Sequence, residues 1–367
     1  MKYKGPDKDL SVIAIISIMG TFLFAYVAYV LIANSFPDSF ISIWNTWDTH
    51  HYLNIAQYGY SSSTVDERHL LIAFFPLYPF LIKILALVLQ NYLLSALLVS
   101  NIAYIFAVFY LYKLVRIDFE KEDALRSIIY FSIFPTAYFL HAAYTESLFL
   151  ALTIASFYYA RKDRWALSGV IGMLAAATRI TGIILLPVLV IEYLSQREYK
   201  KENIRKDILW ILVIALGFVL YLILNYITYG DPLRFLEIQS GHFSKHLAIP
   251  TEGFFSAWTG ILWGTPAISL TFGWFEIIFS ILGLILIIYS FFRLRLSYSL
   301  YALVTWLIVT STSFWLSIPR YTLSIFPIFI VLAILGRRKE INYTVIFLSL
   351  IFYALFLSLF VRFRWAF

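Results

Sequence analysis

The residues best suited to chemistry lie in a polar and aromatic segment that follows the first long apolar stretch. Asp48 stands there among aromatic side chains, at Trp47, His51, Tyr52 and Tyr60. Aromatic rings stack on the apolar faces of pyranose sugars, and a carboxylate holds sugar hydroxyls, so the pattern predicts a sugar site. The structural alternative is an aromatic belt at a membrane surface with a solvated aspartate.

Further charged groups stand in apolar surroundings. Glu146 follows Tyr144 and begins an apolar segment, where it either binds sugar hydroxyls or only favours the positive end of a helix dipole. Arg179 lies in an apolar hairpin, which costs about 2.5–3.5 kcal/mol on insertion scales and demands an anion or a carbonyl. Arg320 lies at a short turn, and Lys83 either reaches a phosphate or extends to the membrane surface.

A metal site is the other chemistry that this region allows. Asp48, His50 and His51 could ligate a divalent ion. Their spacing does not place all three on one helix face, and no second cluster supplies further ligands. We therefore expect no metal and no other cofactor, and a divalent ion remains the alternative. The sequence has no cysteine, which excludes disulfides, thiolate zinc sites and thiol catalysis.

The composition indicates a membrane protein made of helices. Of 367 residues, 61% are hydrophobic and only 13% are charged. The stretches 10–34, 208–227 and 341–361 are long enough to cross a hydrocarbon layer about 30 Å thick. These segments are apolar on every face, which favours a polytopic all-α protein forming a single domain over residues 1–367.

The positive charges show which side each loop faces. The net charge is +7, but most Lys and Arg residues stand in short loops between apolar segments. That is the positive-inside pattern of membrane proteins, so we expect no nucleic-acid partner. The loops at 35–72 and 229–272 then both lie outside. The second loop contains Gln239 and His242 in an amphipathic stretch that we expect to line a cleft.

Two apolar segments do not make a single crossing of the membrane in this topology. Residues 73–90 are interrupted by prolines, and a full crossing would put the next basic cluster outside, so we expect this helix to enter and return or to lie on the outer surface. Residues 165–194 lie between two basic loops and must cross twice. A turn at 178–182, with Gly182 supplying flexibility, would place Arg179 in the outer half of the membrane.

Four motifs stand in order between residues 44 and 190. They are Trp47-Asp48 with His51-Tyr52, Ile55-Ala56 and Gly59-Tyr60; Ala73 to Pro79; Phe134 to Phe139 with Tyr144 to Ser147; and Ala177 to Gly182. Together they resemble the PIG-V mannosyltransferases, which add the second mannose of glycosylphosphatidylinositol anchors, and their microbial relatives. Thr181 stands where that family has asparagine.

The resemblance implies a GT-C glycosyltransferase fold of roughly 10–12 membrane helices, with two long outer loops that carry short amphipathic helices. It also implies a sugar donor linked to polyprenyl or dolichyl phosphate, and inverting transfer of a hexose, above all mannose, on the outer or lumenal face. The acceptor would be a glycolipid or a glycan. The absence of cysteine and the compact chain favour a microbial plasma membrane over an endoplasmic reticulum.

The candidate residues can fill the roles that this chemistry requires. Asp48 would be the base for the acceptor hydroxyl, and Arg179, Arg320 and Lys83 would bind the donor phosphate. The remaining candidates would bind sugar or acceptor: Glu146, His51, Trp47, Tyr52, Tyr60, Tyr144, Gln239 and His242. Two other classes stay open, a transporter or flippase of a lipid-linked sugar and a non-catalytic subunit that binds polyprenyl phosphate.

Overall fold

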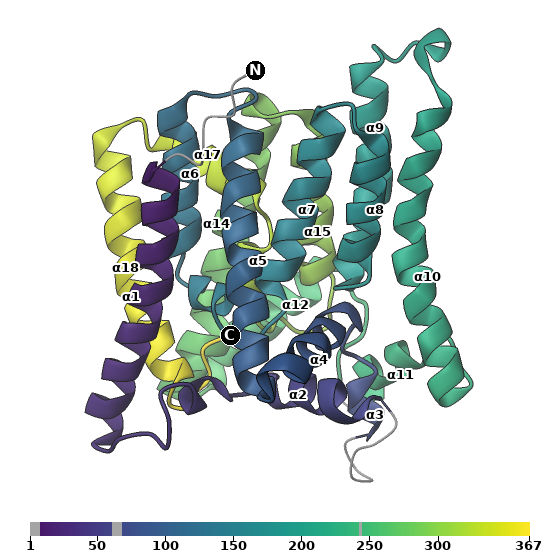
Figure 1. Cartoon of the computed structure of the whole chain (residues 1–367). Helices are drawn as coiled ribbons and strands as arrows, with labels where there is room; N and C mark the ends of the chain where they lie inside the picture. Colours follow the sequence, from purple (N-terminus) through teal and green to yellow (C-terminus); the bar gives the residue numbers. More distant parts are fainter. Residues whose placement is uncertain (1–7, 61–67, 242–243) are drawn as a thin grey trace.

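The computed structural model describes residues 8–60, 68–241 and 244–367. It is 77% helical, and within the described residues the only pairing of β type is an isolated bridge between Leu247 and Thr312. Figure 1 shows long helices side by side, with short helices gathered at one end. The predicted all-α architecture is confirmed.

Five helical runs in the described chain are long and apolar enough to cross a membrane. They are α1 (Lys8–Ala33), α5 (Tyr92–Val115), the run Lys206–Tyr229 that contains α10 (Leu209–Tyr229), the run Pro266–Arg293 that ends in α14 (Phe275–Arg293), and α18 (Lys339–Phe360). Shorter helices complete the bundle: α6 (Lys121–Ile133), α7 (Glu146–Arg161), α8 (Trp165–Ala176), α9 (Leu185–Gln196), α15 (Leu296–Thr310), α16 (Ile318–Leu323) and α17 (Pro327–Leu335). The protein is therefore a multi-pass membrane protein.

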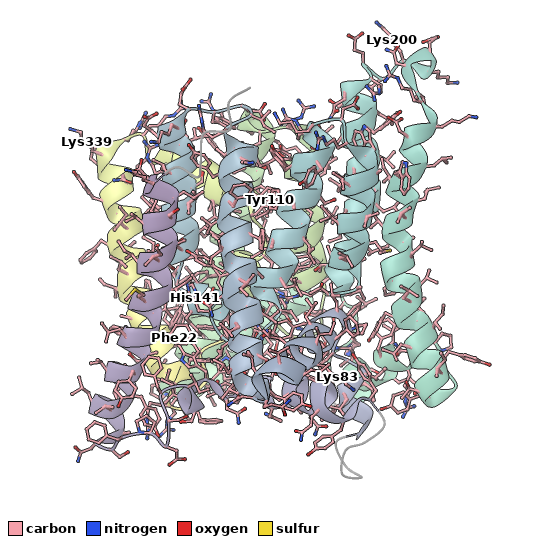
Figure 2. The ribbon with its side chains drawn as sticks, in the orientation of Figure 1. Phe22, Lys83, Tyr110, His141, Lys200 and Lys339 are labelled. Atoms are coloured by element: carbon pink, nitrogen blue, oxygen red, sulfur yellow. The ribbon has the colours of Figure 1, made fainter. Side chains whose placement is uncertain are left out.

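The bundle has two distinct ends. Lys200 and Lys339 lie at the upper end in Figure 2, which we call the basic end. The short helices of the two long loops lie lower, so we call the lower end the loop end (Figure 1). These helices are α2 (Thr49–Tyr58), α3 (Arg68–Leu71), α4 (Leu77–Leu89), α11 (Arg234–Gly241), α12 (Pro250–Trp263) and α13 (Pro266–Ile268). Both loops thus share one end, as expected from the charge pattern.

Helix α4 does not cross the bundle. Its 13 residues span only about 20 Å at 1.5 Å per residue, and Gln90 ends it in the left-handed conformation with φ 52°. Asn91 then caps α5, because its side chain accepts the N–H of Leu94 at 2.9 Å. Since α5 begins at the loop end directly after α4, the expectation that 73–90 stays on this side agrees with the structure.

Hydropathy alone would predict one crossing helix over 127–143, but α6 ends at Ile133. Phe134 is extended, with ψ 144°, because it precedes Pro135 and helical backbone there would clash with the proline ring. The chain then runs through a buried 3₁₀ turn, Ala137–Leu140, before α7 begins at Glu146. The irregular segment places the first turn of α7 inside the bundle rather than at its surface.

The hairpin predicted over 165–194 is present as α8 and α9, joined by a 3₁₀ turn at Ile180–Ile184. A Cβ atom on Gly182 would lie 2.5 Å from the backbone of Ala175, so glycine is needed for close packing and not for flexibility. Close approach also explains Gly217, where a Cβ would lie 2.0 Å from the Met173 carbonyl oxygen, between α10 and α8.

Candidate functional site

Four charged side chains from distant parts of the chain form one connected cluster toward the loop end. Arg320 Nη1 lies 3.2 Å from Asp48 Oδ2, and Arg320 Nε lies 2.6 Å from Glu146 Oε1. Arg179 Nη1 contacts the same Glu146 oxygen at 2.9 Å. We call these four residues the charged cluster. It contains two carboxylates and two guanidinium groups, so its formal charge is balanced.

Asp48 stands immediately before α2, where the chain turns sharply. Trp47 has a positive φ of 50°, which a residue with a side chain adopts only when its surroundings hold it there. Tyr144 helps to fix this backbone conformation, because its hydroxyl accepts the Asp48 N–H at 3.2 Å and donates to the Thr46 carbonyl at 3.3 Å. The indole of Trp47 packs edge-on against Trp365 at 5.6 Å. The backbone of Asp48 is therefore tied to the cluster independently of its carboxylate.

A buried glutamate of α14, Glu276, fixes the turn that carries Arg320. Both of its oxygens accept backbone N–H groups, from Ser317 at 2.8 Å and from Ile318 at 2.7 Å. Ser317 is in the left-handed conformation with φ 68°, and α16 begins at the next residue. Sequence reasoning missed Glu276. The available signal was a lone carboxylate within an apolar segment, which is itself a mark of a functional position.

Arg179 stands at the start of the 3₁₀ turn between α8 and α9. Among the described residues only its Nη1 has a hydrogen-bond partner, and its guanidinium lies 5.5 Å from the centroid of the Tyr321 ring. Lys245 Nζ lies 5.8 Å from the same ring. Sequence reasoning also missed Lys245, a residue of the second loop that gave no signal beyond its charge. One ring thus has two cations beside it.

Exposure separates the two carboxylates. The side chain of Glu146 is 0% exposed, whereas that of Asp48 is 39% exposed. Glu146 already has two arginine partners on one oxygen, and its Oε2 is buried with no hydrogen-bond partner in the described structure. Asp48 is thus the carboxylate of the cluster that an incoming molecule can reach.

Aromatic residues predicted for the site surround the cluster. The Arg320 guanidinium lies 4.6 Å from the ring centroids of both Tyr144 and Phe139. Tyr52 is buried and packs edge-on against Phe74 at 5.0 Å. Burial raises the pKa of the Tyr52 hydroxyl, and the nearby Asp48 and Glu146 carboxylates add to this, so the group stays protonated.

The other first-loop candidates lie against the same aromatic layer. The His51 ring lies 5.0 Å from Phe74. The Tyr60 hydroxyl donates to the Phe74 carbonyl at 2.7 Å. Phe74 therefore links both residues to Tyr52, which joins the first loop into one packed unit around Asp48.

Two of the predicted residues, Lys83 and Gln239, are not brought to the cluster. Lys83 lies on an exposed face of α4 toward the loop end (Figure 2), and no contact in the described part of the chain joins it to the arginines. Gln239 lies on α11, which packs on α10, and its carbonyl accepts the Lys245 N–H at 2.9 Å. His242 lies outside the described residues. In the described ranges no three His, Asp or Glu side chains gather in a way that could hold a metal ion.

The arrangement combines an accessible carboxylate with cations that can meet a phosphate. A guanidinium fixed by a buried carboxylate stays charged where little water reaches it, and it presents its remaining N–H groups in a rigid plane. Asp48 can accept a proton from a hydroxyl, while Arg179 and Lys245 can stabilise a departing anion.

The fold matches solved GT-C enzymes. ArnT from Cupriavidus metallidurans, bound to undecaprenyl phosphate, aligns with 90% of this chain and 61% of its own, with a TM-score of 0.56 and 12% identity. The Archaeoglobus fulgidus oligosaccharyltransferase, in complex with Zn and sulfate, aligns with 95% of this chain and 53% of its own, with a TM-score of 0.50 and 14% identity. The chain therefore has the GT-C glycosyltransferase fold, as predicted.

Sequence comparison then identifies similar proteins within that fold class. The profile of the family described as "Dolichyl-phosphate-mannose-protein mannosyltransferase" matches residues 75–226. The "GPI alpha-1,6-mannosyltransferase 2" of Mus musculus is 29% identical over 212 residues, which cover 51% of this chain and 41% of the mouse protein. The resemblance to the PIG-V mannosyltransferases is thus confirmed. The chain spans less than half the length of this mouse relative.

Proposed function

We propose that this protein is an inverting glycosyltransferase that moves mannose from a polyprenyl- or dolichyl-phosphate carrier to a glycolipid or glycan. The reaction takes place at the loop end, which we assign to the outer or lumenal side of the membrane. The observation that carries the proposal is the charged cluster, in which an accessible carboxylate, Asp48, and an arginine with unoccupied N–H groups, Arg179, are held together by Glu146 and Arg320.

In this proposal Asp48 is the general base. It removes the proton from the acceptor hydroxyl as that oxygen attacks the anomeric carbon of the donor. Arg320 donates to Asp48 at 3.2 Å and to Glu146 at 2.6 Å. Since its N–H groups already serve two carboxylates, the ion pairs favour a positioning role for Arg320 over the phosphate contact expected from the sequence.

Arg179 and Lys245 bind the donor phosphate. Only one nitrogen of Arg179 is occupied in the described structure, which leaves N–H groups for phosphate oxygens. The charged cluster is balanced by itself, so a phosphate adds negative charge that Lys245, beside the shared Tyr321 ring, offsets. As the glycosidic bond breaks, the bonding electrons pass to the phosphate oxygen, and both cations stabilise the leaving group.

Inversion follows from the number of accessible carboxylates. Retention by double displacement needs a nucleophile on one side of the sugar and an acid or base on the other. In the charged cluster Glu146 is fully buried and shared by two arginines, whereas Asp48 is 39% exposed. One working carboxylate supports a single displacement, in which the acceptor oxygen attacks directly.

The comparisons support the donor class. ArnT, which shares the fold, was solved bound to undecaprenyl phosphate. The family profile over residues 75–226 carries the name of dolichyl-phosphate-mannose enzymes, and its range contains Glu146 and Arg179. These names support mannose as the sugar and a polyprenyl chain as its carrier.

The test is a transfer assay with purified protein, a membrane lipid extract as acceptor, and radiolabelled polyprenyl-phosphate mannose or glucose. We expect label from the mannose donor to enter the extract. Asp48→Asn should lower the rate about 10²- to 10⁴-fold while donor binding is retained, because only the base is lost. Asp38→Asn is the matched control, since Asp38 is an exposed aspartate of the same loop.

The same assay separates the alternatives. A flippase would move the donor across vesicle membranes and transfer no label, and a binding subunit would bind the donor equally well in both variants without transfer. Normal transfer by the Asp48→Asn protein would refute the proposal. Reactions with EDTA or with added Mn²⁺ test the expectation that no metal is required.

The sides of the membrane can be assigned with oriented vesicles. In inverted vesicles from a microbial plasma membrane, where we place the protein, the loop end should face inward, and water-soluble acceptors added outside should receive no label. Labelling of outside acceptors by inverted vesicles would reverse the orientation.

A further inference from the structure

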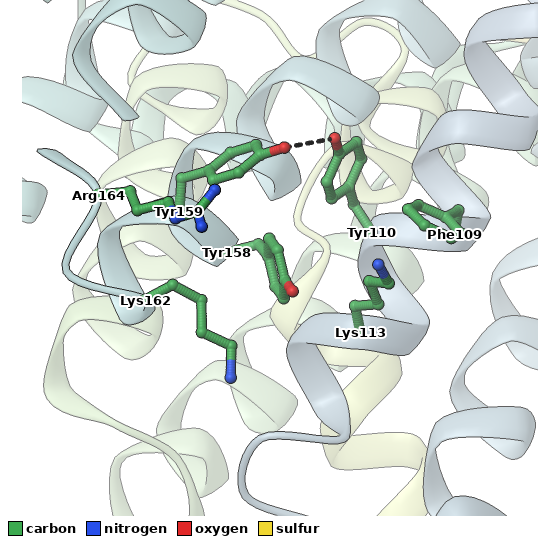
Figure 3. A pocket seen from close by; sticks show the side chains of 7 residues that line it. All are labelled: Phe109, Tyr110, Lys113, Tyr158, Tyr159, Lys162 and Arg164. Carbon is green, nitrogen blue, oxygen red and sulfur yellow. Dashed lines mark hydrogen bonds between the residues drawn. The ribbon is translucent and has the colours of Figure 1, made fainter. Parts of the chain in front are cut away.

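A charged pocket lies at the basic end, opposite the charged cluster. It is a cavity of about 530 Å³ between the last turns of α5 and α7 and the turn that leads into α8. Figure 3 shows Lys113 on one side of it, and Lys162 and Arg164 on the other. We call it the basic-end pocket. Nothing in the proposed transfer reaction uses it.

The three cations of this pocket differ from the arginines around them. Within the described residues, none of Lys113, Lys162 and Arg164 forms an ion pair. By contrast, Arg161 pairs with Asp118 at 2.5 Å and Arg197 pairs with Asp163 at 2.6 Å, and both arginines lie close to the pocket in the chain or in space. The pocket therefore concentrates uncompensated positive charge, which attracts an anion.

Aromatic side chains shape the pocket and orient its cations. Lys113 Nζ lies 4.2 Å from the centroid of the Phe109 ring and 5.8 Å from that of Tyr158. On the opposite wall, Lys162 Nζ lies 5.9 Å from Tyr158. The Tyr110 and Tyr159 hydroxyls are 3.0 Å apart and hydrogen-bonded (Figure 3). Two ammonium groups thus stand on either side of one tyrosine, close to further hydroxyl groups that can bond to an oxyanion.

The surface that leads to the pocket is apolar. Ile102, Ile105 and Phe106 of α5 are each about half exposed. They precede Phe109 by seven, four and three residues, and Lys113 follows Phe109 by four, so all lie on one stripe along the helix that ends at the pocket. A stripe of this kind packs against hydrocarbon chains. A ligand that fills both features has an anionic head and apolar tails.

We propose that the basic-end pocket binds the phosphate of an anionic phospholipid from the adjacent membrane leaflet. Lys113, Lys162 and Arg164 meet the phosphate charge, the tyrosine hydroxyls bond to its oxygens, and the acyl chains lie along Ile102 and Phe106. Clusters of basic residues next to membrane helices bind anionic head groups in this way. The ligand class is a phosphate monoanion, and the apolar stripe selects a lipid over free phosphate.

The test uses delipidated full-length protein in a neutral detergent, titrated with phosphatidylglycerol or with phosphatidylcholine, and native mass spectrometry to count bound lipid. We expect roughly tenfold tighter binding of the anionic lipid. The triple variant Lys113→Gln, Lys162→Gln and Arg164→Gln should bind both lipids equally. Tyr159→Phe, which keeps the charges and the ring, should lower the preference by a smaller factor.

The matched control removes three other cations from the same end: Lys201→Gln, Lys206→Gln and Lys339→Gln. All three residues are exposed. The control has the same net charge as the pocket variant, so it should keep the lipid preference if the pocket is the site. Loss of preference in both variants would reduce the effect to bulk attraction and overturn the proposal.

The last part of the lipid-binding test is competition with inorganic phosphate. Added at millimolar concentration, it should leave phosphatidylglycerol bound, because it lacks the contacts along α5. If phosphate displaces the lipid completely, the pocket is a site for soluble phosphate and the proposal is wrong. Equal binding of both lipids to the unmodified protein would also overturn it.

Discussion

The two ends of the bundle contain similar ion-pair networks, which differ in how fully their hydrogen-bonding groups are used. At the loop end, Arg179 and Arg320 share Glu146, whose side chain is 0% exposed. At the basic end, Arg161 and Arg295 share Glu192, whose side chain is 1% exposed, and Arg161 also pairs with Asp118, which is 31% exposed. Water screens an exposed pair and can replace either partner, whereas a buried carboxylate between two cations has no substitute. Both Glu192 oxygens have partners, since Oε2 accepts the Ser297 hydroxyl at 2.6 Å, whereas Glu146 Oε2 has none in the described structure. The loop-end network is thus the less saturated of the two.

The largest effect that we expect comes from Glu146→Gln. A neutral amide leaves Arg179 and Arg320 close together with only the partly exposed Asp48 to compensate their charge, which costs about 3–5 kcal/mol of stability. Asp118→Asn at the basic end should cost about 1 kcal/mol or less, because that position is partly hydrated. Thermal unfolding in detergent micelles compares the two. Similar melting temperatures for both variants would remove the distinction between a buried and a partly hydrated carboxylate.

A smaller effect should follow from Arg179→Lys. Lysine keeps the charge but loses the planar fork, and the loss of one hydrogen bond to a charged group, about 1.5–3 kcal/mol, predicts donor binding weakened ten- to hundredfold. Arg197→Lys is the matched change at the basic end, where the partner Asp163 is 46% exposed. Donor binding by that variant should be normal. Equal weakening would mean that the change acts through stability and not through the donor.

Much of the fold follows from the sequence because apolar length and loop charge are local signals. The hairpin over 165–194 and the short helix within 73–90 were both predicted in this way, and α8, α9 and α4 confirm them. The end of α6 was missed, although Pro135 carries the signal. The apolar character of the chain continues through 134–143, so hydropathy does not mark the end of the helix. The backbone restriction before a proline does not depend on hydropathy.

The site could be predicted only in part. An arginine in an apolar hairpin must find an anion, so the need for a partner to Arg179 was evident. The sequence did not show which anion this partner would be, since Glu146 is 33 residues away from Arg179. The link from Arg320 to Asp48 spans 272 residues. Such pairings arise from helix packing. The basic-end pocket was hidden for another reason, because its cations had been counted only as markers of topology.

Glu276→Gln tests whether the backbone turn before Arg320 matters to the reaction. Glutamine has one acceptor oxygen where Glu276 uses two, so one buried N–H, from Ser317 or Ile318, loses its partner. That costs about 1–3 kcal/mol, and we expect kcat to fall about tenfold as Arg320 shifts. Because Glu276 does not contact the donor, KM should hardly change.

The control for this change is Glu252→Gln, an exposed glutamate in the first turn of α12. Its kcat and KM should match the unmodified protein. A purely structural role for Glu276 would lower the melting temperature and the amount of active protein while kcat per folded molecule stayed constant. That result would exclude Glu276 as a positioning residue.

The smallest effect concerns the two lysines that compete for the donor phosphate at the loop end. Lys245 lies beside the Tyr321 ring that also contacts Arg179, whereas Lys83 lies on an exposed face of α4. Lys245→Gln should weaken donor binding about two- to fivefold, the range of a partly hydrated charge pair, and Lys83→Gln should leave it unchanged. The Lys245 contribution should shrink as salt rises from 0.05 to 0.5 M, roughly, because screening acts on exposed charges. If Lys83→Gln has the larger effect, the phosphate lies over α4. The donor then enters along the first loop, and Arg179 acts only as the partner of Glu146.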